Sequence, residues 1–66
     1  MDRSELKAEI ARKGITNRSI ARELHISEQT FYNKLNGDNE FKESEIKALI
    51  KVLNLSPSRV NEIFLF

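Results

Sequence analysis

The chain contains no cysteine and only one histidine among its 66 residues. Disulfide bonds and cysteine-based zinc sites are therefore excluded, and a single histidine leaves too few ligands for most metal clusters. We expect neither a metal nor another cofactor. Without such cross-links a chain of this length lies near the lower limit for stable folding, so its core must be compact. The sequence predicts a small all-α protein with one domain over residues 1–66.

Long hydrophobic runs are also missing. No stretch approaches the roughly 20 apolar residues that a membrane-spanning helix needs. The charged N-terminus lacks the apolar stretch of a signal peptide. We therefore expect a cytoplasmic protein.

A strong charge of either sign is absent as well. The formal net charge is +1, far from the strongly basic balance of many nucleic-acid-binding proteins. Residues 1–37 hold seven Lys or Arg against five Asp or Glu, whereas residues 38–66 hold four against five. Any binding to nucleic acid would therefore depend on a few cations in particular positions, and its non-specific component would be weak.

The most informative stretch is residues 16–37, TNRSIARELHISEQTFYNKLNG. Thr16 and Ser27 are residue types that cap helix N-termini, which predicts helices over residues 17–24 and 28–35. Only three residues separate these helices, so the connection must be a tight corner. Ala21 is small enough for the close approach of the two helices, and Ile26 is an apolar plug for the turn.

The second of these helices has a polar face opposite its apolar stripe. At about 100° per residue, this face is centred on Gln29 and Asn33, with Thr30 and Lys34 beside them. Side-chain amides can pair with adenine in a major groove, and a hydroxyl can serve several base edges. By itself such a face is more often simply a solvated helix face than a surface that reads DNA.

The same stretch resembles the helix-turn-helix of the phage repressor and Cro family, also called Xre-type regulators. The family pattern is Gln, three residues, Ala, three residues, Gly, an aliphatic, Ser or Thr, then a Thr and an aliphatic before a closing Asn-Gly. Asn17 stands at the Gln position and His25 at the Gly position. The matching residues are Ala21, Ile26, Ser27, Thr30, Phe31 and Asn36-Gly37. His is one of the few other residue types enriched at positive φ, so we expect slight strain at His25 and no loss of the fold.

The resemblance implies a sequence-specific regulator of transcription that binds double-stranded DNA in the bacterial nucleoid. The residues expected to read bases are Glu28, Gln29, Thr30 and Asn33. The residues expected to contact the DNA backbone are Asn17, Arg18, Arg22, Tyr32, Lys34, Asn39 and Lys42. Two alternatives remain: Glu28 can accept from cytosine N4 or favour the helix dipole, and Tyr32 can touch DNA or flank the core.

The rest of the chain is expected to complete a small five-helix bundle of the phage-repressor type. A first helix over residues 2–13 has an apolar stripe of Leu6 and Ile10 backed by Ala11. Phe41 is a plug after the motif. A fourth helix over residues 43–53 lacks a conventional cap, and a last helix begins with Ser56-Pro57 and runs to about residue 64.

The C-terminus is unusually apolar. Part of it must close the core, and the rest is a candidate dimer interface, which suits the pseudo-palindromic operators that the resemblance implies. The interface candidates are Val60, Phe64, Leu65 and Phe66. The alternative function is a protein-interaction module, an anti-repressor or antitoxin-like partner that uses this apolar end. We expect no enzyme, because no nucleophile lies beside a base and the chain is too small for a sizeable pocket.

Overall fold

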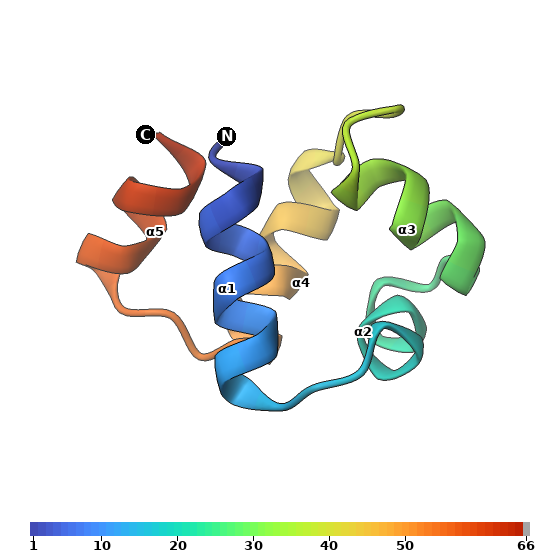
Figure 1. The fold of residues 1–66 in the computed structure, drawn as a ribbon, viewed down its shortest axis with the longest axis horizontal. Coiled ribbons are helices and arrows are strands. Elements are labelled where there is room, and N and C mark those ends of the chain that lie inside the picture. The colour runs from blue at the N-terminus through green and yellow to red at the C-terminus, as the bar shows by residue number, and fades with distance from the viewer. Residues whose placement is uncertain (66) are drawn as a thin grey trace.

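The computed structural model describes residues 1–65, which form five α-helices and no strand. The helices are α1 (Arg3–Lys13), α2 (Asn17–Leu24), α3 (Glu28–Leu35), α4 (Glu43–Val52) and α5 (Pro57–Phe64). Figure 1 shows α1 in the middle of the molecule, α5 on one side of it, and α2 and α3 on the other. The all-α class and the positions of the helices agree with the sequence-based prediction.

Side-chain caps begin four of the five helices. Asp2, Thr16, Ser27 and Ser56 each accept a hydrogen bond from the backbone N–H three residues later. The predicted caps at Thr16, Ser27 and Ser56 are therefore confirmed. They are residue types whose short side-chain oxygens reach the unpaired N–H groups of the first turn.

Three helices end in the same hydrogen-bonded turn. After α2 the N–H of Ile26 donates to the carbonyl of Ala21, and the N–H of His25 donates to Arg22. This pair of bonds defines a Schellman motif, which requires a left-handed residue. His25 adopts it with φ 59° and ψ 39°, as expected. Gly37 and Asn54 play the same role after α3 and α4.

One hydrophobic core joins the helices. Phe31 of α3 and Phe41 of the following loop meet with ring centroids 5.9 Å apart, so Phe41 has its predicted plugging role. Ile26 is half-buried against the core at the α2–α3 turn. The buried apolar residues are Leu6, Ile10, Ile20, Ala21, Leu24, Phe31, Leu35, Phe41, Leu49, Leu53, Ile63 and Phe64.

Charged residues tie α1 to α5. The guanidinium of Arg59 donates to Glu9 at 2.7 Å and to Glu5 at 2.9 Å. Glu9 is buried and also pairs with Arg12, whereas Ala11 is exposed. The expectation that Ala11 backs the apolar stripe was wrong, because the ion pairs with α5 turn Glu9 inward instead.

The two ends of the described chain lie side by side (Figure 1). The backbone N–H of Asp2 donates to the carbonyl of Ile63 at 2.6 Å. The start of α1 is thereby fixed against the end of α5. Within residues 1–65, no helix is long and apolar enough to cross a membrane.

Candidate nucleic-acid interface

Residues 16–37 contain α2, α3 and the three residues between them. Ala21 is 2 % exposed and Leu24 is 6 % exposed, so both belong to the core rather than to the surface of α2. The Schellman turn at His25 ends α2, and Ser27 caps α3 two residues later. Local hydrogen bonds therefore fix the end of α2 and the start of α3.

The outer face of α3 carries two amides that are bonded to each other. Gln29 donates through Nε2 to Oδ1 of Asn33 at 3.0 Å, and no other residue of the described chain holds either side chain. The Gln29 carbonyl oxygen and the Asn33 amide nitrogen remain open to a ligand. Because the bond spans one helical turn, it presents the two amides as a single polar strip.

Thr30 takes part in the N-terminal cap of α3. Its N–H donates to Oγ of Ser27 at 3.0 Å, and the Ser27 hydroxyl donates to Oγ1 of Thr30 at 2.7 Å. The Thr30 hydroxyl keeps its own hydrogen for an acceptor. Of the base-reading candidates, Thr30 is thus the most constrained, and its side chain is half-buried.

A shallow hollow joins α3 to the start of α2. It has a volume of about 460 Å³ and is lined by Asn17, Glu28, Gln29 and Tyr32. Tyr32 is 53 % exposed, so it does not belong to the core. The structure therefore brings together two expected base-reading residues and two expected backbone-contacting residues. Asn17 adds an amide beside the unpaired N–H groups of the α2 N-terminus, where anions are favoured.

Arg18 and Arg22 lie on the solvent side of α2, four residues apart. Neither forms an ion pair with any residue of the described chain. Asn39 and Lys42 are exposed in and after the loop that follows α3. These four side chains are free to meet an anion, but they do not line the hollow at α3.

Lys34 requires a correction. We expected it to contact the DNA backbone, but its side chain is buried and its ammonium lies 2.6 Å and 2.9 Å from the two oxygens of Glu45. A long lysine side chain at the edge of a helix face can turn towards the interior when a carboxylate of another helix lies within reach. Lys34 therefore joins α3 to α4 and is not available to a phosphate.

Glu45 was missed by sequence reasoning. Its carboxylate also accepts from the backbone N–H of Lys42 at 2.7 Å, which caps α4 in place of a conventional residue. Burial by itself would raise the pKa of Glu45, but the hydrogen bonds from Lys34 and Lys42 outweigh it and lower that pKa. A Glu in the third position of a helix was the available signal.

Two side chains of α1 hold the end of α3. Arg3 donates through Nε to the Lys34 carbonyl at 3.3 Å, and Lys7 donates through Nζ to Oδ1 of Asn36 at 2.9 Å. Cations are favoured at a helix C-terminus, where carbonyls lack partners. Nothing in the local sequence pointed to these contacts, because they join residues about 30 positions apart.

The expected dimer residues have different environments. Phe64 is only 5 % exposed and belongs to the core of its own chain, so the expectation that it forms an interface was wrong. Val60 is half-buried, and Leu65 is 67 % exposed with a left-handed backbone at φ 59°. Phe66 lies outside the described residues.

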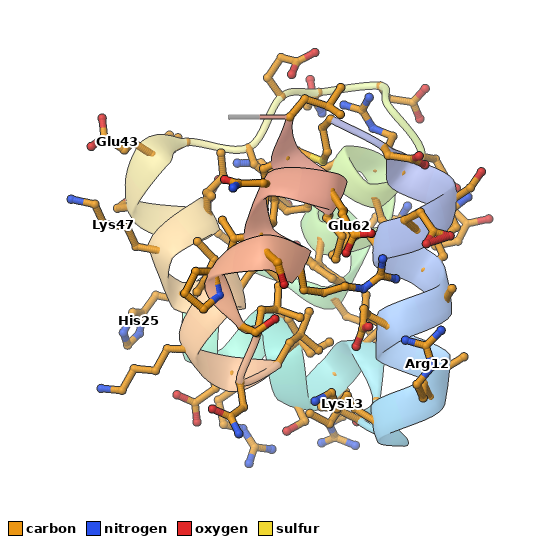
Figure 2. All side chains as sticks on the ribbon, turned by 90° about the vertical axis from the view of Figure 1, so that its left-hand side faces the viewer. Arg12, Lys13, His25, Glu43, Lys47 and Glu62 are labelled. Atoms are coloured by element: carbon orange, nitrogen blue, oxygen red, sulfur yellow. The ribbon has the colours of Figure 1, made fainter. Side chains whose placement is uncertain are left out.

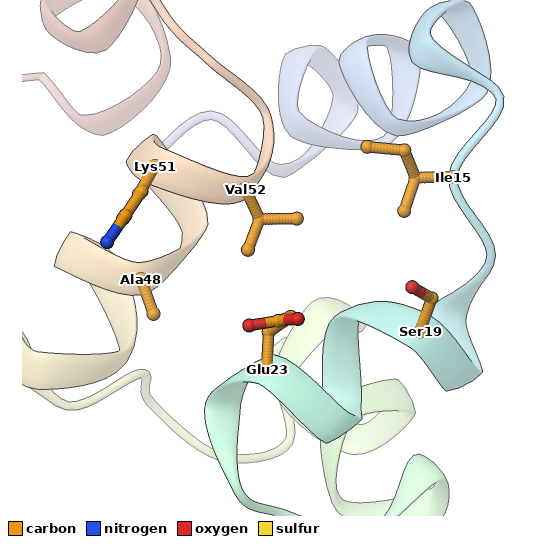
Figure 3. Close-up of a pocket in the computed structure, with 6 residues that line it drawn as sticks. All are labelled: Ile15, Ser19, Glu23, Ala48, Lys51 and Val52. Carbon is orange, nitrogen blue, oxygen red and sulfur yellow. The ribbon is translucent and has the colours of Figure 1, made fainter.

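A second hollow is lined by residues of α2, α4 and the segment before α2. Its volume is about 500 Å³, and Figure 3 shows Ile15 and Val52 on opposite sides of the opening with Glu23 below. Ser19, Ala48 and Lys51 complete the lining. The hollow lies apart from the polar face of α3. No group of three His, Asp or Glu within residues 1–65 is arranged to hold a metal ion.

These features define an all-α protein with one solvated polar helix face beside a tight helical corner. A family model described as a protein of unknown function, DUF739, matches residues 1–66, so the chain belongs to the DUF739 family. No match was found among curated proteins or among solved structures.

Proposed function

We propose that the protein is a sequence-specific regulator of transcription that binds double-stranded DNA, with α2 and α3 acting as a helix-turn-helix. The observation that carries the proposal is the hydrogen-bonded Gln29–Asn33 strip, in which Gln29 is exposed and Asn33 half-buried, beside the α2 N-terminus. An α-helix fits the major groove, and amides are well suited to its donor and acceptor patterns. The neighbouring hollow and the two unpaired arginines of α2 support the same function.

In this function α3 reads base edges. Asn33 offers its amide nitrogen and Gln29 its carbonyl oxygen, since their other groups are engaged with each other. Glu28 is exposed and can accept from cytosine N4, and the remaining Thr30 hydrogen can meet an acceptor. Because Gln29 and Asn33 share a hydrogen bond, the bases that they read are expected to depend on one another.

The contacts to the DNA backbone come from α2 and its surroundings. Asn17 and the α2 N-terminus would hold one phosphate, and Arg18 and Arg22 would meet others. Tyr32 lines the hollow beside Asn17, and Asn39 and Lys42 are further exposed groups that could contact phosphate. The burial of Lys34 removes one cation from the expected set, so few phosphates are neutralised and binding should depend only weakly on salt.

Binding of the protein to its DNA site would regulate transcription. In the simplest case the bound protein would block the polymerase at an overlapping promoter. Two copies would bind half-sites about one helical turn, roughly 34 Å, apart. The backbone of one copy extends 29 Å along its longest axis, which is close to that spacing.

The test is selection of bound duplexes from a random DNA library at low salt. An enriched pseudo-palindrome with half-sites about one turn apart would support a dimeric regulator. A single short enriched site would support DNA binding but would refute the binding of two copies to one operator. Absence of enrichment, from protein shown to be folded by circular dichroism, would refute the proposal.

A second candidate is a protein-interaction module, an anti-repressor or antitoxin-like partner. The favouring observations are the exposed Leu65 and the loop acids Asp38 and Glu40, which would repel phosphate. Arg22→Ala and Leu65→Lys separate the two functions. Only the first substitution should weaken DNA binding if the protein is a DNA-binding regulator.

A further inference from the structure

The exposed side of α3 carries no free cation. Lys34 is the one Lys or Arg in this helix, and its ammonium is held by the carboxylate of Glu45 between α3 and α4. The Lys34 side chain is only 9 % exposed, so it reaches neither a base nor a phosphate while this pair is intact. The polar face of α3 therefore consists of neutral groups and one acid, Glu28.

Exposed cations within residues 1–65 lie on other elements. Figure 2 shows Arg12 and Lys13 towards the end of α1. It also shows Lys47 on α4, where Lys47 and Glu43 form an exposed ion pair with 3.4 Å between the ammonium and a carboxylate oxygen. None of these cations lines the hollow beside α3, so none gives the polar face of α3 a positive charge.

The missing cation bears on guanine. The commonest specific contact in a major groove joins an Arg or a Lys to the O6 and N7 acceptors of guanine. The donors that remain on α3 are the Thr30 hydroxyl and the Asn33 amide nitrogen, which are neutral. They can meet an acceptor of thymine or adenine as well as one of guanine, so they do not select guanine.

The acceptors of α3 are more selective than its donors. In the major groove only adenine and cytosine present an amino group, whereas guanine and thymine present acceptors alone. Glu28 is exposed, accepts only, and forms no ion pair within residues 1–65. The side-chain oxygen of Gln29 is open as well. Both acceptors therefore favour bases with an amino group.

The bond to Asn33 leaves Gln29 with the pair of groups that adenine requires. One hydrogen of Nε2 is donated to Oδ1 of Asn33, and the second hydrogen and the oxygen of the Gln29 amide stay free. Adenine offers an acceptor at N7 and a donor at N6, which match these two groups. Cytosine offers only its N4 donor, which suits the carboxylate of Glu28.

We propose that α3 recognises adenine through Gln29 and cytosine through Glu28, and that it makes no contact that requires guanine N7. The inference names the class of DNA site for the proposed function and rests on that function. The withdrawal of Lys34 into the pair with Glu45 gives α3 this preference, because it leaves acceptors as the selective groups of the face.

The experiment replaces single bases in a duplex that the full chain has selected from the random library. N6-methyladenine and N4-methylcytosine block the amino hydrogen in the major groove, and 7-deazaguanine removes the N7 acceptor. Methylation at one adenine and at one cytosine of each half-site should weaken binding about tenfold or more. The 7-deazaguanine duplexes should bind within about twofold of the original. The measurement is a binding isotherm for each duplex.

Protein variants assign each effect to a side chain. Gln29→Ala should remove the sensitivity to N6-methyladenine, and Glu28→Ala the sensitivity to N4-methylcytosine. Gln29→Arg should change the preferred base at its position from adenine to guanine, because Arg supplies the two donors that guanine accepts. Ser19→Arg adds the same charge at an exposed position of α2 outside the hollow beside α3, and it should leave the base preference unchanged. Each variant is first shown to be folded by its thermal transition.

Three results would overturn the inference. These are a selected half-site without adenine, a loss of affinity with 7-deazaguanine as large as that with N6-methyladenine, and a Gln29→Ala protein that stays sensitive to adenine methylation. Each of them leaves the proposed DNA-binding function in place, since a DNA site has been selected. Absence of any selected site would refute both the function and the inference.

Discussion

The ammonium of Lys34 lies 2.6 Å from Glu45 in the buried space between α3 and α4. The same carboxylate caps α4 through the Lys42 N–H, so one acid holds two helices. Through this pair the orientation of α3, which carries the proposed base-reading face, is coupled to α4.

Glu45→Gln should destabilise the protein by about 3 to 5 kcal/mol, because the buried Lys34 loses its counter-charge. The double variant Lys34→Met with Glu45→Gln should recover most of that loss, since Gln can still cap α4 and no charge stays buried. Urea unfolding gives both free energies. The control is Glu43→Gln in the exposed pair, with a change below about 0.5 kcal/mol. Equal losses in the double and the single variant would show that the charge pair is not the cause.

Lowering the pH should weaken the ion pairs between α1 and α5. The hydrogen bond from Arg59, aided by the charges of Arg12 and Lys13, holds the pKa of Glu9 below its usual value of 4.5. A lowered folded-state pKa stabilises the protein above pH 4.5, and this contribution is lost as the pH falls through the folded-state value. The pKa of Glu45 is lowered too and has the same sign of effect.

The measurement is the thermal transition temperature between pH 7 and pH 3. Glu9→Gln should lower that temperature at pH 7 and reduce its fall on acidification. Glu23→Gln, an exposed control on α2, should retain the full fall. A steeper acid dependence in Glu9→Gln would contradict the expected sign.

Gln29→Ala and Arg22→Ala should affect DNA binding in different ways. Loss of an amide contact should cost about 1 to 3 kcal/mol at the preferred base and relax the preference there. Loss of Arg22 should weaken binding to all DNA sequences about equally. It should also reduce the dependence of the affinity on salt by roughly one released counterion. Binding isotherms on a selected duplex and its single-base variants, at several salt concentrations, test both. Identical effects of the two substitutions would reject the division between base reading and backbone contact.

The left-handed backbone of His25 should limit which residues the α2–α3 turn accepts. A β-branched residue is strained at φ 59°, so His25→Val should be about 1 to 2 kcal/mol less stable than His25→Gly. Chemical unfolding of the two variants gives this difference directly. As a control, Val and Gly at the exposed helical position Ser19 should differ less and in the opposite order. A His25→Val protein as stable as His25→Gly would mean that the turn can change its conformation.

Helix boundaries were predictable because their causes are local. Thr16, Ser27 and Ser56 each bond to an N–H three residues away, and His25 and Asn54 end helices through neighbouring carbonyls. These interactions depend on residue type and short spacing, which a single sequence displays directly. The α3 face that carries Gln29 and Asn33 was predictable for the same reason, since helical periodicity separates these amides from the buried Phe31.

The ion pairs were not predictable because they join distant positions. Arg59 and Glu9 are 50 residues apart, and Lys34 and Glu45 are 11 apart on different helices. A helical wheel assigns Lys34 to the edge of the polar face, but it does not reveal whether an acid from another helix lies within reach of the side chain. Charged residues with long apolar stems are therefore the ones most easily assigned to the wrong side of a helix.

The bond between the Asp2 N–H and the Ile63 carbonyl has a practical consequence. Because the beginning of α1 and the end of α5 are adjacent, an affinity tag or surface tether at either end leaves the molecule at the same corner. A short peptide linker could also join the two ends and allow the chain to be opened elsewhere. Such a circularly permuted protein, opened in the exposed loop at residues 38–40, would keep α2 and α3 continuous.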